Sequence, residues 1–154
     1  MSHPSRSRIR TVAVGVGIAV VCLCLVGAST VTAQQVNVDA NNLAGNGTAD
    51  DPYQITNASE LQAMEDDLDA HYELTTDIDA SDTAQWNGGS GFDPVGDGDG
   101  DFNGYLDGNG FQITQLTIDR SNSNEEVGLF GEVDSATIES VYLDSATIAG
   151  NRSV

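Results

Sequence analysis

Two β-rich stretches near the end of the chain constrain its fold more than any other feature. Residues 111–119 can be laid over residues 136–144 with an offset of 25, so that Ile113 meets Ile138 and Ile118 meets Leu143. A shorter echo aligns residues 134–138 with residues 144–148. A period in the twenties, with β-forming residues at fixed places, predicts a stacked β-solenoid in which each unit is about one coil. A β-meander would give the same pattern.

The part of the chain before these stretches predicts a short helix. Asn57 can accept from first-turn amides, and Glu60 stands three residues later, where it can reach back. Leu61, Met64 and Leu68 follow at helical spacing, with acidic residues on the other face. We expect an amphipathic helix of roughly ten residues, placed to cap one end of the coils.

The fold class that we predict is all-β, a short right-handed parallel β-helix with this one N-terminal capping helix. Residues 34–52 are interpreted as a polar leader. Residues 53–104 form the cap region, which holds the helix and a loop rich in Gly and Asp. Residues 105–154 supply about two coils, fewer than the roughly three that stacked repeats need. We therefore expect an incomplete solenoid with an unpaired edge: a truncated gene product, a chain that continues downstream with more coils, or a chain whose edge pairs with another chain.

The first 33 residues predict a secretory signal peptide. Arg6, Arg8 and Arg10 precede an apolar run from Val12 to Val26, and Ala33 ends a small-x-Ala site. Cleavage after Ala33 would place the mature chain outside the cell or at its surface. An uncleaved anchor helix is the alternative, because the run extended to Ala33 approaches the roughly 20 residues that span a bilayer.

The mature chain is extremely acidic. It has 24 Asp and Glu residues, no Lys and no Cys, and only two arginines, so its formal charge is −22. Such self-repulsion opposes compaction at ordinary ionic strength, whereas roughly 1 M salt shortens the Debye length to about 3 Å. The composition therefore predicts a protein of a halophilic archaeon. It also argues against nucleic acid as a partner, since there is no basic patch to meet phosphate.

Several segments resemble GLUG-motif surface proteins. Gly128-Leu129-Phe130-Gly131 is similar to the Gly-Leu-aromatic-Gly signature of these repeats, and residues 47–55, 61–79 and 102–110 are similar to neighbouring parts. The resemblance covers residues 45–150 and implies a right-handed β-helix of the pectin-lyase-like type in large secreted or wall-associated proteins. Those proteins usually carry several GLUG units, and this chain has one. The family has no general catalytic motif to carry over.

The residues of the GLUG-like motif also have a direct physical interpretation. Gly128 and Gly131 would suit corners between coil faces, because Gly tolerates a positive φ. Leu129 and Phe130 would then supply one inward and one outward side chain.

A run of oxygen-bearing side chains imitates the start of a calcium loop. Asp99, Asp101, Asn103 and Asp107 fall at loop positions 1, 3, 5 and 9, with Gly104 at position 6. Position 12 is a glycine, so the bidentate acid is missing. An Asp-rich turn is the alternative, and calcium is the one cofactor that the sequence suggests.

Other candidate residues are few. Arg120 is interpreted as a solvated surface residue and His71 as a structural one. Trp86 and Phe92 could stack on a sugar ring or cover the open end of the coil. Three sites fit the N-glycosylation pattern, at Asn46, Asn57 and Asn151.

These features favour a non-catalytic cell-surface or extracellular module that takes part in adhesion or envelope interactions. Its expected partner is an envelope or extracellular polysaccharide or protein, with membrane contact only through an uncleaved signal segment. The alternative is a carbohydrate-active enzyme, a polysaccharide lyase or hydrolase, or a remnant of one. Paired carboxylates can cleave glycosides, but in a chain with 24 acids some pairs are close by chance.

Overall fold

The fold is described by a computed structural model, for residues 35, 37–98, 100–122 and 127–151. These residues belong to one compact unit. The predicted signal segment at residues 1–33 lies outside the described residues.

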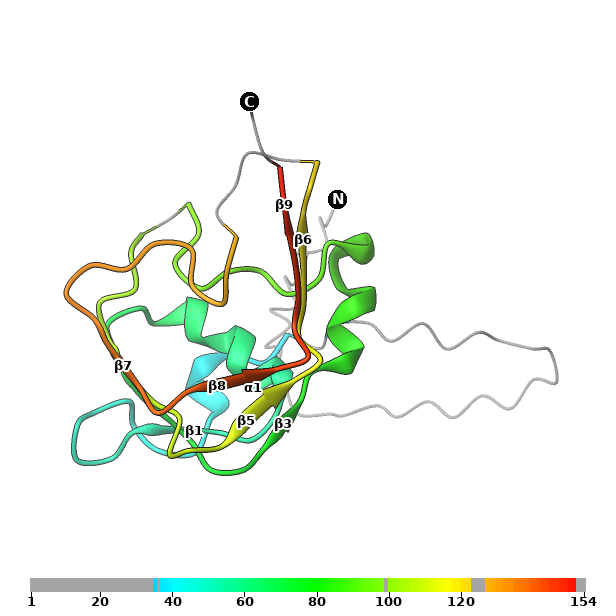
Figure 1. The fold of residues 1–154 in the computed structure, drawn as a ribbon. Helices are drawn as coiled ribbons and strands as arrows, with labels where there is room; N and C mark the ends of the chain where they lie inside the picture. The colour runs from blue at the N-terminus through cyan, green and yellow to red at the C-terminus, as the bar shows by residue number, and fades with distance from the viewer. Residues whose placement is uncertain (1–34, 36, 99, 123–126, 152–154) are drawn as a thin grey trace, which may run out of the picture. The chain divides into compact units, whose positions relative to one another are not determined.

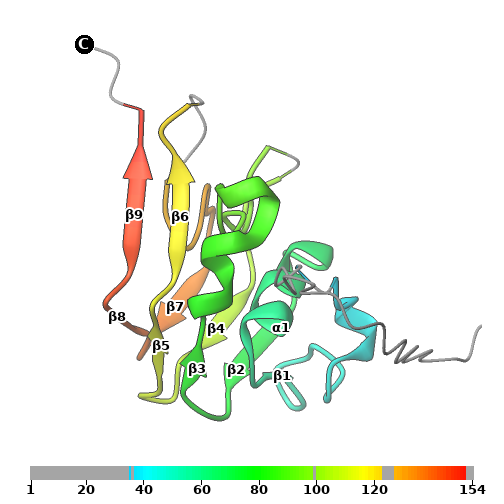
Figure 2. The ribbon, with the colours of Figure 1, turned by 90° about the vertical axis from the view of Figure 1, so that its right-hand side faces the viewer.

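Nine short strands form three parallel sheets in the described part of the chain. The first sheet has the order β1-β2-β4-β7, the second β3-β5-β8 and the third β6-β9. The strands are β1 Tyr53–Ile55, β2 His71–Leu74, β3 Ile78–Asp79, β4 Tyr105–Asp107, β5 Gln112–Thr114, β6 Thr117–Arg120, β7 Thr137–Glu139, β8 Tyr142–Asp144 and β9 Thr147–Gly150. Figure 1 shows the three sheets on three sides of the unit, and Figure 2 shows the first sheet strand by strand.

The chain visits the three sheets in the same order twice. It passes β4, β5 and β6, which we call the inner layer, and then β7, β8 and β9, which we call the terminal layer. Each terminal strand pairs in parallel with its inner counterpart. A meander is excluded for these strands, because its neighbouring strands would run antiparallel.

The predicted overlay of the two layers is wrong in register. Ile113 pairs with Leu143 rather than Ile138, and Ile118 pairs with Ile148. The strand that holds Ile138 pairs with β4 instead, opposite Leu106. The overlay failed because successive faces repeat every five residues, so any offset that is a multiple of five aligns apolar residues with apolar residues.

The corners between faces explain this five-residue unit. Gln115, Ser135, Ser140 and Ser145 all have a positive φ between 54° and 58°. Each ends one face and turns the chain into the next, in a left-handed conformation that non-glycine residues seldom adopt.

The helical part of the chain follows β1. Helix α1, Ala58–Gln62, continues into the 3-10 helix η2, Ala63–Asp66. The Asn57 side chain accepts from the Glu60 N–H at 3.0 Å, which confirms the predicted N-cap. Glu60 reaches back to the N–H of Thr56 at 2.7 Å. Leu61 and Met64 are fully buried in the core.

The free edge of β1 is covered by the segment that precedes it. Ala44 forms an antiparallel bridge with Gln54, and the 3-10 helix η1, Ala40–Asn42, packs nearby against η2. Ala40 and Leu43 are buried in the core. We call this the closed end of the stack.

One further 3-10 helix completes the layer before β4. Helix η3, Ser81–Gly89, follows β3 and packs beside β6, where the terminal layer has a strand. Its Trp86 is buried, and so is Phe92 just after it. Phe92 donates its N–H to the carbonyl of Thr117 at 2.9 Å.

Candidate functional site

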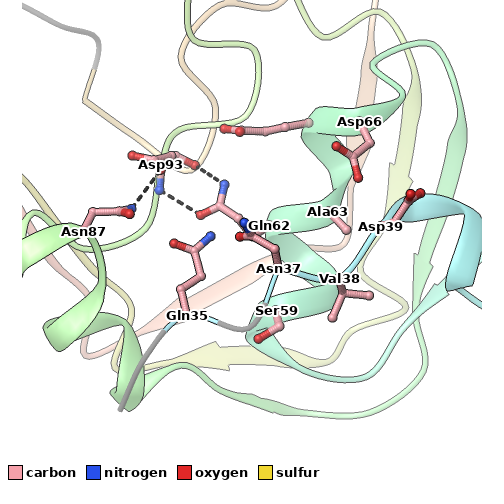
Figure 3. Close-up of a pocket in the computed structure, with 11 residues that line it drawn as sticks. Gln35, Asn37, Val38, Asp39, Ser59, Gln62, Ala63, Asp66, Asn87 and Asp93 are labelled. Atoms are coloured by element: carbon pink, nitrogen blue, oxygen red, sulfur yellow. Dashed lines mark hydrogen bonds between the residues drawn. The ribbon is translucent and has the colours of Figure 1, made fainter. Parts of the chain in front are cut away.

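A large hollow lies at the closed end of the described structure. It is a cavity of about 650 Å³ with a largely polar wall, built by the segment before η1, by α1 and η2, and by η3 with the loop after it. Figure 3 shows the polar side chains around it. The wall is formed by Gln35, Asn37, Val38, Asp39, Ser59, Gln62, Ala63, Glu65, Asp66, Asn87 and Asp93.

Gln62 joins the helix to the loop across this pocket. Its Nε2 donates to the Asp93 carbonyl at 2.9 Å, and its Oε1 accepts from the Asp93 N–H at 2.9 Å. The side chain is buried, so both amide groups need such partners. The paired hydrogen bonds, drawn in Figure 3, fix Asp93 in place.

The Asp93 carboxylate is held from two sides. Asn87 donates Nδ2 to it at 2.8 Å, and Arg120 forms an ion pair with its other oxygen. Arg120 also donates to the carbonyls of Ser90 at 2.8 Å and Phe92 at 3.2 Å.

The prediction that Arg120 is a solvated surface residue is wrong. Its side chain is only 5% exposed, and it ties β6 to the loop at Ser90–Asp93. Buried guanidinium groups are stabilised by charge pairing and hydrogen bonds, and Asp93 and the carbonyls of Ser90 and Phe92 provide both here. Arg120 is therefore a structural cation in a chain that has almost none.

Glu65 at this site has a strongly raised proton affinity. Partial burial of the group, followed by the carboxylates of Asp93, Asp97 and Asp66, raises the pKa of Glu65 to about 7, and Arg120 opposes this. The side chain as a whole is exposed at the pocket rim. Near neutral pH Glu65 can therefore exchange a proton with solvent, as a general acid or base must.

The other acids of the pocket hold the backbone. Asp66 accepts from the Ala40 N–H at 3.0 Å, and Asp39 accepts from the Asn41 N–H at 2.8 Å. The hydrogen bond from the Asn41 N–H is the main reason why the pKa of Asp39 lies below its ordinary value. Within the described residues, no group of three His, Cys, Asp or Glu side chains could hold a metal ion.

Of the four residues in the predicted calcium site, three lie within the described structure and one does not. Asp99 lies outside the described residues. Asn103 donates Nδ2 to the Asp101 carbonyl at 2.9 Å, and Asp107 accepts from the Asn109 N–H at 2.7 Å. Both are contacts of Asp-rich turns, and the calcium site stays a prediction.

The GLUG-like residues pack against the loop before β4. Leu129 is buried, and the ring of Phe130 lies 4.9 Å from that of Phe102. Leu129 accepts from the Val95 N–H, and Gly131 donates to the Val95 carbonyl.

The predicted reason for the two glycines of this motif is wrong, because neither has a positive φ. Close approach explains them instead. A Cβ on Gly128 would meet the Phe130 carbonyl oxygen at 2.8 Å. On Gly131 it would meet the Gly96 carbonyl oxygen at 3.1 Å.

The aromatic candidates divide into buried and stacked residues. Trp86 and Phe92 are buried, which argues against sugar stacking at the surface, one of the two roles considered for them. His71 stacks on the ring of Tyr105 at 5.4 Å, across neighbouring strands of the first sheet. This contact agrees with a structural role for His71.

The three glycosylation candidates are all exposed. The Asn57 side chain already caps α1, and the Asn46 amide donates to Asp51. Asn151 is described, whereas the rest of its sequence motif lies outside the described residues.

Sequence reasoning missed the pocket and most of its contacts. Arg120 could have been found, because it stands two residues after Ile118 in one strand and therefore points to the same face. Gln62 and Asp93 are far apart in sequence, and no local pattern predicts that they meet.

No helix in the described part of the chain is long and apolar enough to cross a membrane. Comparison with known proteins gives two similar proteins. In an alignment of 119 residues that covers 71% of the chain, it is 46% identical to halomucin of Haloquadratum walsbyi. Over 92 residues, 58% of its length, it is 39% identical to a protein of Evansella cellulosilytica that is named as a Gly-rich membrane protein. No family model matches the chain, and no solved structure matches it.

The matched segments are small parts of these relatives, 1% of halomucin and 10% of the second protein. Neither relative has the name of an enzyme, and the second is named as a membrane protein. The similarity is consistent with a surface or envelope protein of a halophile, which agrees with the acidic composition.

Proposed function

We propose that this chain is a non-catalytic module of an extracellular or cell-surface protein in a halophile, and that it acts in adhesion or envelope interactions. The observation that carries the proposal is the 46% identity to a segment of halomucin. The pocket at the closed end supports it, since Asp39, Asp66 and Asp93 each hold a backbone or charge partner.

The proposal includes the fold and the route of export. Parallel stacking of the terminal layer on the inner layer supports a short right-handed parallel β-helix. The basic and apolar start of the sequence supports export through a signal peptide that ends at Ala33. N-terminal sequencing of the protein recovered outside the cell should begin at Gln34, and a membrane-bound product that begins at Met1 would replace the signal by an anchor.

A carbohydrate-active enzyme is the second candidate, and Glu65 is the observation that favours it. A carboxyl group with a pKa of about 7 at the rim of a polar cavity suits general acid catalysis on a glycoside. The surrounding acids and amides could hold sugar hydroxyl groups.

One assay in molar salt separates the two candidates. The chain is mixed with envelope preparations and with acidic polysaccharides, and both retention of the chain and new chain ends in the polysaccharide are measured. We expect retention without turnover, unchanged in Glu65→Gln. Turnover that Glu65→Gln abolishes, while an Asn109→Asp variant keeps it, would make the enzyme the better conclusion.

A further inference from the structure

The terminal layer exposes an apolar face that the inner layer buries. Ile138, Leu143 and Ile148 are 40%, 42% and 45% exposed. Their register partners in the inner layer, Leu106, Ile113 and Ile118, are all 0% exposed. We call Ile138, Leu143 and Ile148 the terminal face. Contiguous apolar surface of this kind marks an interaction site.

The backbone edge at this face is also unsatisfied. In the described residues, β7, β8 and β9 are each the last strand of their sheet, so each leaves one row of N–H and C=O groups unpaired. The opposite end of the stack is covered by the Ala44–Gln54 bridge and by buried Ala40 and Leu43. The terminal face of one copy therefore cannot pair with the closed end of another.

We propose that the terminal face binds the terminal face of a second copy of this chain, end to end about a two-fold axis through Leu143. Such an axis would place β8 antiparallel to the partner's β8, and β7 antiparallel to the partner's β9. Two-fold interfaces of this kind bury the same patch on both copies and do not propagate into fibres.

The spacing of the face allows this arrangement. Ile138 and Ile148 lie five residues before and after Leu143. One axis through Leu143 therefore sets Leu143 opposite itself and Ile138 opposite the partner's Ile148. The five-residue spacing of apolar residues made the sequence overlay ambiguous. The same spacing lets the terminal face match a second copy of itself. All three apolar side chains would keep their inward direction, because the axis is perpendicular to the stack.

The same register keeps like charges apart. The strands carry acids at Glu139 and Asp144. In the proposed pairing Asp144 lies opposite the partner's Tyr142, and Glu139 lies opposite the partner's Thr147. Each carboxylate thus faces a hydroxyl-bearing side chain, whereas like charges directly opposite would destabilise the pair. Exposed Tyr142 gains a partner in this way.

The long-range charge sets the condition for assembly. Two mature chains of formal charge −22 repel one another at low salt, and molar salt screens the repulsion. The dimer is therefore expected at high salt and should weaken as salt is lowered, before the fold itself is lost.

The first test is the mass of the complete chain by light scattering in molar salt over a range of concentrations. We expect a monomer–dimer equilibrium. Leu143→Asp should raise the dimer dissociation constant about 100-fold or more, because it buries two unpaired carboxylates on the axis. Gln112→Asp adds the same charge on an exposed outward position of the inner layer and should leave the constant within about threefold.

The second test locates the axis and does not depend on the fold of Leu143→Asp. A Leu143→Cys chain should form a disulfide-linked dimer on mild oxidation, since directly opposed residues have Cβ atoms roughly 5 Å apart. Tyr142→Cys should not, because it faces the partner's Asp144. The unchanged sequence controls for Cys22 and Cys24 in the N-terminal segment.

Three outcomes overturn the proposal. The first is a monomer at all concentrations in molar salt, as a further coil of a longer chain over the face would produce. The second is open-ended filaments, which require head-to-tail contacts. The third is equal cross-linking of Leu143→Cys and Tyr142→Cys, which would place the contact elsewhere.

Discussion

The inner and terminal layers have the same inward pattern and opposite surroundings. Ile113 and Leu143 occupy matching positions in β5 and β8, yet Ile113 is fully buried and Leu143 is 42% exposed. The difference comes from position in the stack, because among the described strands the inner layer has neighbours on both sides and the terminal layer on one side. A strand pattern thus decides which way a side chain points, while the next layer decides how much that direction contributes to stability.

The edges of the two layers differ in a second way. Arg120 at the end of β6 is in register with Gly150 at the end of β9. In the inner layer this position carries a buried cation that anchors the loop at Ser90–Asp93, and in the terminal layer it carries no side chain. The terminal layer is therefore attached by its ladders and by few side-chain links, of which the Tyr105–Glu139 hydrogen bond is one. This hydrogen bond is the main reason why the pKa of Tyr105 is raised to about 12.

Removal of salt should reveal the largest difference in stability between the inner and terminal layers. We expect the fold to be lost on dilution into low-salt buffer, because a formal charge of −22 is then unscreened. Circular dichroism across a salt titration follows the loss of the fold. Hydrogen exchange on dilute protein should show the amides of β7–β9 exchanging at higher salt than those of β4–β6, since fewer contacts hold them.

Loss of protection at the same salt concentration in both layers would contradict the expected difference in their stability. A β spectrum unchanged down to millimolar salt would show instead that packing outweighs repulsion. Repeating the titration with a neutral osmolyte in place of salt separates screening from general stabilisation.

A matched pair of core substitutions should give the next largest effect. Ile113→Ala removes a fully buried side chain and should lower the free energy of unfolding by about 2–5 kcal/mol. Leu143→Ala at the paired position should cost less than about 1.5 kcal/mol, because water already reaches that side chain. Chemical denaturation in molar salt, on protein dilute enough to be monomeric, measures both. Equal costs would mean that the terminal face is covered in the monomer.

Local sequence signals predicted the elements better than their register. Asn57 and Glu60 predicted the helix start because a cap depends on neighbours only three residues away. The alternation around Ile113 and Ile118 predicted strands with the correct inward faces. The offset of 25 failed because Ser135, Ser140 and Ser145 turn the chain every five residues, and a pattern with that period has no unique alignment.

Most of the candidate site could not be predicted from the sequence. Its central contacts join Gln62 to Asp93 and Arg120 to Asp93, and they depend on how the loop after η3 returns to the helix. Among so many acids, nothing local marks Asp93 as the one that pairs with an arginine. The role of Gly131 was also hidden, because it depends on the approach of Gly96 from a distant segment.

The smallest expected effect is that of Glu65 on the pH dependence of stability. Substituting Glu65 at the closed end and Glu139 in the terminal layer compares the two regions. Its folded pKa of about 7 lies above the ordinary value of 4.5, so between these values the folded state binds more protons than the unfolded state. Stability should therefore fall as pH rises from about 5 to about 7, and the contribution of Glu65 stays lost above that. Solvent and salt screen this exposed group, so we expect a change below about 1 kcal/mol. Glu65→Gln should flatten this part of the stability profile, as measured by denaturation at several pH values in molar salt. Glu139→Gln, the same change on the terminal layer, serves as the control and should keep the slope. If Glu65→Gln leaves the slope unchanged, the enclosure and the neighbouring carboxylates do not act on Glu65 in solution, and the case for proton transfer at this pocket fails with them.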